Sequence, residues 1–122
     1  MSVRLLDGVT ATGASSAVKV KNAMQHAVQA NFTNSGGSVT ALTVDLEGTI
    51  NNQGEIDAAT AVWFQLASHA FTAGELSAQA AQFTVAVGPE RYIRANITTL
   101  TETGTTAVYV RHQAYDGGDL RN

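Results

Sequence analysis

The chain has 122 residues, 44% of them apolar, which is enough for one domain with a single core. The formal net charge is −3, and the seven Lys and Arg residues are scattered, so no basic stripe is available to bind nucleic acid. Cysteine is absent, which excludes disulfides, thiolate metal sites and a cysteine nucleophile. We find no apolar run long enough for a signal sequence or a membrane span, and therefore expect synthesis in the cytoplasm and no membrane partner.

The first 16 residues are expected to form an extended arm. The short apolar stretch with Val3, Leu5 and Leu6 is followed by Gly8 and Gly13, a composition that runs extended but packs poorly alone. Such an arm would become ordered on assembly, against a shell or a neighbouring subunit. After it, residues 18–21 alternate valine with lysine and predict a short edge strand.

Six later segments alternate between apolar and polar residues with a period of two, as half-buried strands do. Residues 72–82 are expected to form a loop with one turn of helix, and residues 58–61 offer another helical turn. The predicted inward faces of the six strands are Val28, Ala30, Phe32; Leu42, Val44, Leu46; Val62, Phe64, Leu66; Phe83, Val85, Val87; Ile93, Ala95, Ile97; and Val108, Val110.

Clusters of turn-forming residues separate these strands. The segments 34–38 and 102–104 each predict a hairpin, and Gly88–Glu90 predicts a further turn. The chain therefore divides into an N-terminal arm (1–16), a sandwich domain (17–113) and a C-terminal tail (114–122). The fold class is all-β, an antiparallel β-sandwich of about eight strands with extended terminal arms, either Ig-like or jelly-roll.

Three segments carry a resemblance to a known group of proteins. In order they are Val44–Gly48, Val62–Leu66 and Arg91–Thr98, followed by Gly104 before the last strand. This series resembles small β-sandwich structural proteins of tailed bacteriophages, in which a V-x-G strand, a tryptophan strand and an R-Y-I/V-R-A-N strand recur. The resemblance covers about residues 28–112.

The resemblance implies a non-enzymatic component of the virion. It implies a capsid decoration or cement protein that binds the major capsid protein across capsomer junctions and stabilises the shell by mass action. We expect such a protein to self-associate, as a trimer, on the capsid surface. A tail component or head-tail adaptor is the alternative within the same class.

Aromatic and cationic residues on the outer strand faces are the candidate partner contacts, because both types are enriched in protein interfaces. Trp63 has a second interpretation as a core or semi-core residue. A receptor- or carbohydrate-binding module of a tail tip, stacking sugars on Trp63, Tyr92 and Tyr109, is a further alternative. Together with the arm, the predicted interface comprises Val3, Leu5, Leu6, Trp63, Tyr92, Arg94, Tyr109 and Arg111.

No catalytic, cofactor-binding or metal site is predicted. The three histidines, His26, His69 and His112, have no spacing that places two imidazoles on one metal ion. Asp45 and Glu47 share one strand face, which suits either paired carboxylates or a solvated surface. The segment 116–119 contains two aspartates but lacks the other oxygen ligands of a calcium loop.

Overall fold

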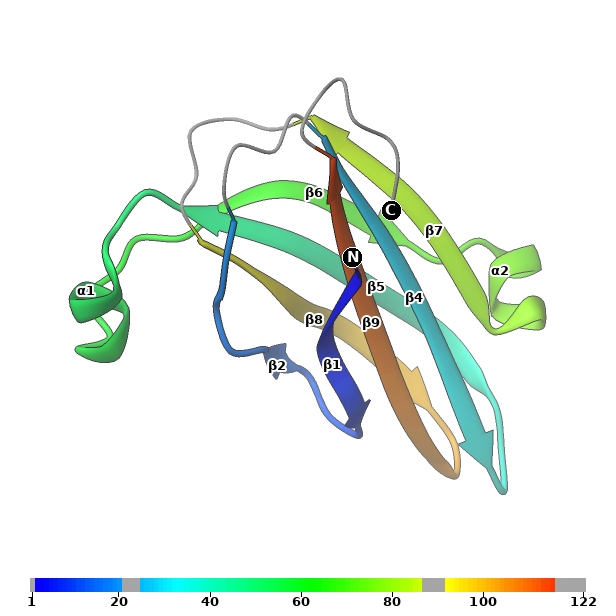
Figure 1. The fold of residues 1–122 in the computed structure, drawn as a ribbon. Coiled ribbons are helices and arrows are strands. Elements are labelled where there is room, and N and C mark those ends of the chain that lie inside the picture. Colours follow the sequence, from blue (N-terminus) through cyan, green and yellow to red (C-terminus); the bar gives the residue numbers. More distant parts are fainter. Residues whose placement is uncertain (1, 21–24, 87–91, 116–122) are drawn as a thin grey trace.

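Two antiparallel sheets pack face to face in the computed structural model, which describes residues 2–20, 25–86 and 92–115 (Figure 1). The predicted turn at Gly88–Glu90 and the tail from residue 116 lie outside these residues. Sheet A has the strand order β1 (Ser2–Val9), β9 (Thr105–Tyr115), β4 (Gln25–Ser35) and β7 (Ala80–Ala86). Sheet B has the order β2 (Gly13–Ala14), β8 (Tyr92–Glu102), β5 (Val39–Thr49) and β6 (Phe64–Ala70), and β3 (Val18–Lys19) also pairs with β8.

The order of the strands is that of a jelly roll. Most connections pass from one sheet to the other, and among the described strands only β2–β3 and β5–β6 follow each other within a sheet. In the sequence, one or two strands of sheet B lie between successive strands of sheet A, which is the double-sheet arrangement of jelly rolls. The predicted all-β sandwich is confirmed, in its jelly-roll form and not its Ig-like form.

The two predicted hairpins at 34–38 and 102–104 are wrong, because each loop joins strands of different sheets. β4 pairs with β9 and β5 pairs with β8, so the two loops cross between the layers side by side. The Thr103 amide donates to the Ser38 carbonyl at 2.8 Å, and Asn34 Nδ2 donates to the Thr103 carbonyl at 3.0 Å. Gly104 has φ +74°, and a Cβ there would lie 2.4 Å from the Ser35 carbonyl oxygen, so this close approach requires glycine.

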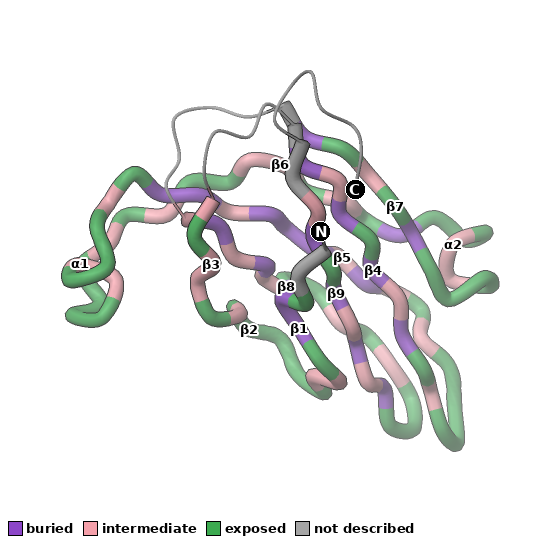
Figure 2. The backbone as a smooth tube through the Cα atoms, viewed as in Figure 1, coloured by how far each residue is buried: buried purple, intermediate pink, exposed green. Residues whose placement is uncertain are grey.

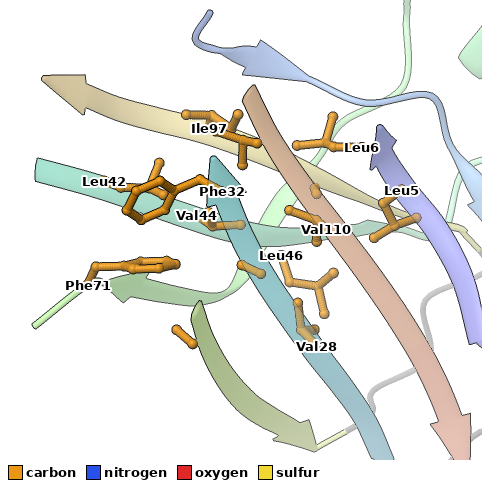
Figure 3. Close-up of a cluster of buried hydrophobic side chains, with 14 of the residues drawn as sticks. Leu5, Leu6, Val28, Phe32, Leu42, Val44, Leu46, Phe71, Ile97 and Val110 are labelled. Carbon is orange, nitrogen blue, oxygen red and sulfur yellow. The ribbon is translucent and has the colours of Figure 1, made fainter. Parts of the chain in front are cut away.

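The core lies between the sheets and is built from the inward-facing strand positions (Figures 2 and 3). Four of the six predicted inward faces are confirmed in full, because their members are almost completely buried: those of residues 28–32, 42–46, 93–97 and 108–110. In β7, Val85 is buried and Phe83 is packed against the core, whereas Val87 lies outside the described residues.

The predicted inward face of Val62, Phe64 and Leu66 is wrong at its first two positions. Val62 is 57% exposed and Phe64 is 63% exposed, while Leu66 packs partly against the core. The reason is positional: the end of sheet B that carries the helix α1 (Gln53–Asp57) projects beyond the strands of sheet A (Figure 1). Phe64 lies at this end on the edge strand β6, whereas Ile93, in the same row on the inner strand β8, is buried.

The N-terminal segment expected as an arm supplies a strand of the sandwich. β1 pairs with β9, and Leu5 and Leu6 are only 8% and 5% exposed. A register shift between Arg4 and Leu6 allows these two consecutive leucines to face inward, whereas a regular strand would turn one of them outward. Leu5 and Leu6 are therefore core residues of their own chain.

Two short helices flank the sandwich, and each begins with a capping box. In α1, Asn52 and Glu55 exchange side-chain and backbone hydrogen bonds; in α2 (Ala73–Ala78), Thr72 and Glu75 do the same. α2 confirms the helical turn predicted within 72–82, whereas the turn predicted at 58–61 lies earlier, in α1, because Asn52 provides the cap. In the described part of the chain, no helix has the length and apolarity needed to cross a membrane.

Candidate functional site

A cluster of polar and aromatic side chains lies on the outer face of sheet B near α1. Arg94 of β8 is directly opposite Glu47 of β5, and its Nε donates to Glu47 Oε1 at 2.6 Å. Asn96 Nδ2 donates to the other carboxylate oxygen of Glu47 at 3.1 Å. The guanidinium of Arg94 lies over the indole of Trp63, 4.2 Å from its centroid. We call Glu47, Trp63, Arg94 and Asn96 the Trp63–Arg94 cluster.

This cluster fixes the arginine in place. The side chains of Arg94 and Glu47 are 26% and 14% exposed, so their ion pair is shielded from solvent far more than a surface pair. Indole and carboxylate together hold the guanidinium plane through a cation–π contact and a charge-assisted hydrogen bond. The hydrogen bond to Glu47 uses the Nε of Arg94, and among the described residues no hydrogen bond to its two terminal nitrogens is found.

A groove of about 270 Å³ adjoins the cluster. Its first wall is the segment between β2 and β3, which is anchored to β8: the Ser15 amide donates to the Ala95 carbonyl at 2.7 Å, and Ser15 Oγ accepts from the Ala95 amide at 2.9 Å. The opposite wall comes from α1 and the turn after it. The complete lining is Ser15, Ser16, Ala17, Ile56, Ala59, Ala61, Trp63 and Arg94.

Three large apolar side chains are exposed at the same end of the molecule. Ile50, Val62 and Phe64 are 61%, 57% and 63% exposed, and we call them the apolar patch. Asn51 connects the two chain segments of the patch, because its Oδ1 accepts from the Val62 amide at 2.8 Å and from Thr49 Oγ1 at 2.8 Å. The patch is thus held on an ordered part of the fold.

The predicted interface residues do not form one surface. Tyr92 lies on the outer face of sheet B with Arg94 and pairs with Thr49. Tyr109 and Arg111 lie on the outer face of sheet A, opposite to the buried Val108 and Val110. The remaining three predicted residues belong to β1, where Leu5 and Leu6 are in the core and Val3 pairs with His112.

A single platform of three aromatic rings is therefore absent from the described structure. Tyr109 sits over β1, since a Cβ at Gly8 would lie 3.5 Å from its hydroxyl oxygen. A hollow of about 230 Å³ on the same sheet is lined by residues that include Gln29, Gln82 and Arg111, and its lining contains no tryptophan, tyrosine or phenylalanine. Trp63 is partly exposed, which agrees with its semi-core interpretation, and it is one of the residues that line the groove.

Sequence reasoning missed a pair of buried histidines. His26 and His112 are 0% and 4% exposed, and His26 Nδ1 lies 2.6 Å from His112 Nε2. Burial, followed by the charge of His26, lowers the pKa of His112 from 6.5 to about 4. The sequence alternation does place both histidines in the inward-facing rows of β4 and β9. That these two histidines lie next to each other can be predicted only once the pairing of β4 with β9 is known.

The other titratable groups singled out from the sequence have structural partners. His69 Nε2 lies 2.9 Å from Glu75 Oε1, and its ring stacks on Phe83 at 5.2 Å. The Thr72 amide and then His69 lower the pKa of Glu75. Both carboxylate oxygens of Glu47 are engaged by Arg94 and Asn96, which does not fit an acid/base pair with Asp45. No three potential metal ligands gather within the described residues.

Comparisons with known proteins support the fold. No protein-family model matches the chain, and no curated protein matches its sequence. A crystal structure of the SPBc2 prophage-derived protein YomS is similar, with a TM-score of 0.57 and 10% identity over 92% of this chain and 90% of that one. A CBM4 structure (TM-score 0.49, 10% identity, 92% and 70% covered) and a chain from infectious bursal disease virus strain Gx (0.45, 10%, 98% and 32%) are less similar. At this identity, the likeness to YomS concerns the fold.

Proposed function

We propose that this protein is a non-enzymatic structural component of a phage virion, a capsid decoration protein that docks on the shell through the α1 end of sheet B. The observation that carries the proposal is the exposed apolar patch of Ile50, Val62 and Phe64 at the α1 end of sheet B. The Trp63–Arg94 cluster lies at the same end, on the outer face of the sheet, whereas Phe64 is in the inward-facing row of Gly48 and Ile93. Clustered apolar side chains that remain exposed on a small folded domain mark an interaction surface.

The composition of this surface suits a protein partner. Tryptophan, tyrosine and arginine are the residues that most often dominate binding energy, and Trp63, Tyr92 and Arg94 all lie here. Arg94 is preorganised by Glu47, so little side-chain entropy is lost when a partner acceptor meets its terminal nitrogens. The groove of about 270 Å³ is smaller than most small-molecule sites and fits one inserted side chain.

The proposed location draws on two further points. The sequence resembles small β-sandwich proteins of tailed phages, and a prophage-derived protein has a similar fold. Jelly rolls also build viral capsids and lectins, so fold alone leaves the partner open. We choose the capsid over the tail because the resemblance implies a decoration protein, and the major capsid protein is its proposed partner.

Purified virions test the proposal. Quantitative mass spectrometry would count copies per particle for the wild type and for Phe64→Ser and Arg94→Gln. A copy number that follows the capsid lattice, reduced in both variants, supports capsid decoration. Arg111→Gln, on the other sheet, is the matched control and should leave incorporation unchanged. A small ring-like copy number would favour the tail, and absence from particles would refute the virion role.

The groove also favours a second candidate, a carbohydrate-binding module. Trp63 is the single tryptophan, and it lines the groove beside the donors of Arg94 and the hydroxyls of Ser15 and Ser16. Sugar binding would therefore change tryptophan fluorescence directly. Saturable glycan titrations that disappear in Trp63→Leu, with the fold intact by circular dichroism, would replace the decoration role with this one.

A further inference from the structure

The four sheet edges of this jelly roll differ in how they are protected against pairing with another strand. Exposed edges present unpaired N–H and C=O groups, and proteins shield them with charges, bulges, proline or short strands. β1 contains two register shifts and an exposed Arg4–Asp7 ion pair, and β2 and β3 have two residues each. β6 carries a register shift opposite Leu46 and Glu47.

β7 has none of these protections. Its seven residues, Ala80–Ala86, contain no charged residue and no proline. All seven pair with β4 in an unbroken register from Ala80 to Ala86, so the strand contains no bulge. In the described part of the chain, residues 80–86 make no backbone hydrogen bond apart from that ladder. Figure 1 shows β7 at the margin of sheet A, with α2 at its N-terminal end.

The sequence of β7 is also self-complementary. Around Phe83, Gln82 corresponds to Thr84, Ala81 to Val85, and Ala80 to Ala86. Two antiparallel copies of β7, related by a two-fold axis at Phe83, would therefore place each polar side chain opposite a polar side chain of the other copy. Each alanine or valine would lie opposite another apolar side chain, and no like charges would be in contact. A two-fold contact uses the same patch on both subunits and requires this property.

We propose that two copies of this chain pair through β7, antiparallel about Phe83, so that sheet A continues from one copy into the other. We assign a second copy of this chain as the partner of this edge because the sequence of β7 is complementary to itself in the antiparallel orientation. The strand also contains no charged residue that would repel a second copy. The contact is independent of the proposed virion role and of the α1 end. It gives a dimer, in place of the trimer expected from the sequence.

The register predicts a charge test. Gln82 and Thr84 are exposed on the outer face, and residue 82 of one copy faces residue 84 of the other. Gln82→Lys with Thr84→Lys places two pairs of lysines opposite each other, whereas Gln82→Glu with Thr84→Lys places two opposite-charge pairs there. The variants have the same number of changes at the same positions.

Sedimentation equilibrium over a wide concentration range would measure the dimer dissociation constant. We expect the double-lysine variant to weaken dimerisation roughly tenfold, and the glutamate–lysine variant to dimerise at least as tightly as the wild type. Amide hydrogen exchange in 80–86 should slow with rising concentration, while exchange in β6 should not. Circular dichroism would establish that both variants are folded.

Three results would overturn the proposal. One is a wild type that stays monomeric throughout. Another is equal dissociation constants for the two double variants, since the register requires them to differ. The last is a trimer whose mass and hydrogen exchange in β7 are insensitive to both pairs of substitutions.

Discussion

Acidification should destabilise the fold through the buried pair of His26 and His112. The pKa of His112 is lowered from 6.5 to about 4, first by burial and then by the charge of His26. Below pH 6.5 the unfolded chain therefore binds a proton at this residue that the folded chain does not bind. Stability is fully present above pH 6.5 and falls with pH until about 4, where the folded protein also takes up the proton.

The magnitude follows from the size of this gap. The difference between 6.5 and about 4, at about 1.36 kcal/mol for each pKa unit, gives a loss of about 3 kcal/mol once both states are protonated. At about pH 5, where most carboxylates are still ionised, the same relation gives about 2 kcal/mol. Because a small domain is stable by only about 5–15 kcal/mol, this loss is a measurable share.

Urea unfolding at several pH values between about 7.5 and about 5 would measure this loss. His112→Gln keeps a hydrogen-bonding side chain beside His26 but does not titrate, so its stability should fall by about 2 kcal/mol less over the same interval. His69→Gln, outside the core, is the matched control and should retain the loss. Equal pH dependence in the wild type and His112→Gln would refute the assignment of the loss to this residue.

Three further predictions concern other parts of the fold. Leu6→Ala should lower the free energy of unfolding by about 2–5 kcal/mol in chemical denaturation, because the side chain is buried; a change near zero would return β1 to the role of a free arm. Gly104→Ala should destabilise the protein in the same assay, because its Cβ would meet the Ser35 carbonyl at 2.4 Å at a positive φ, whereas Gly36→Ala, with positive φ but open space, should cost less. Arg94→Gln should shift the fluorescence of Trp63 by removing the stacked guanidinium, while Arg111→Gln should leave it unchanged.

Strand positions were predictable from the sequence, but strand partners were not. Alternation identifies which residues of a strand share a face, and the rows of Val44 and Ile97 are buried as expected. A turn such as residues 34–38 indicates that the chain reverses, yet a hairpin and a crossing between sheets use the same turn-forming residues. The choice depends on long-range ladders such as β4–β9, whose partners are distant in sequence.

The same limit applies to the candidate site. Trp63, Tyr92 and Arg94 were identified from residue type and outward direction, and the fold brings them to one end of sheet B. Tyr109 and Arg111 satisfied the same criteria but belong to the other sheet. The exposure of Phe64 could not be predicted from the alternation of its strand or from the composition of the chain. It depends on the position of Phe64 at the end of sheet B that extends past sheet A.

The two proposed contacts lie far apart on the molecule and are therefore compatible. α1 and the apolar patch lie at one side of the sandwich, and β7 lies at the other (Figure 1). A dimer formed through β7 would carry two copies of the α1-end surface. Once one copy is bound to a repeating lattice, the other is held close to a neighbouring site, so the dimer binds more tightly than a monomer would. Hence the double-lysine variant in β7 should weaken binding to particles although it leaves the Trp63–Arg94 cluster intact, and Arg94→Gln should weaken binding without changing the dimer. Identical losses of dimerisation in both variants would show that the two surfaces are not separate.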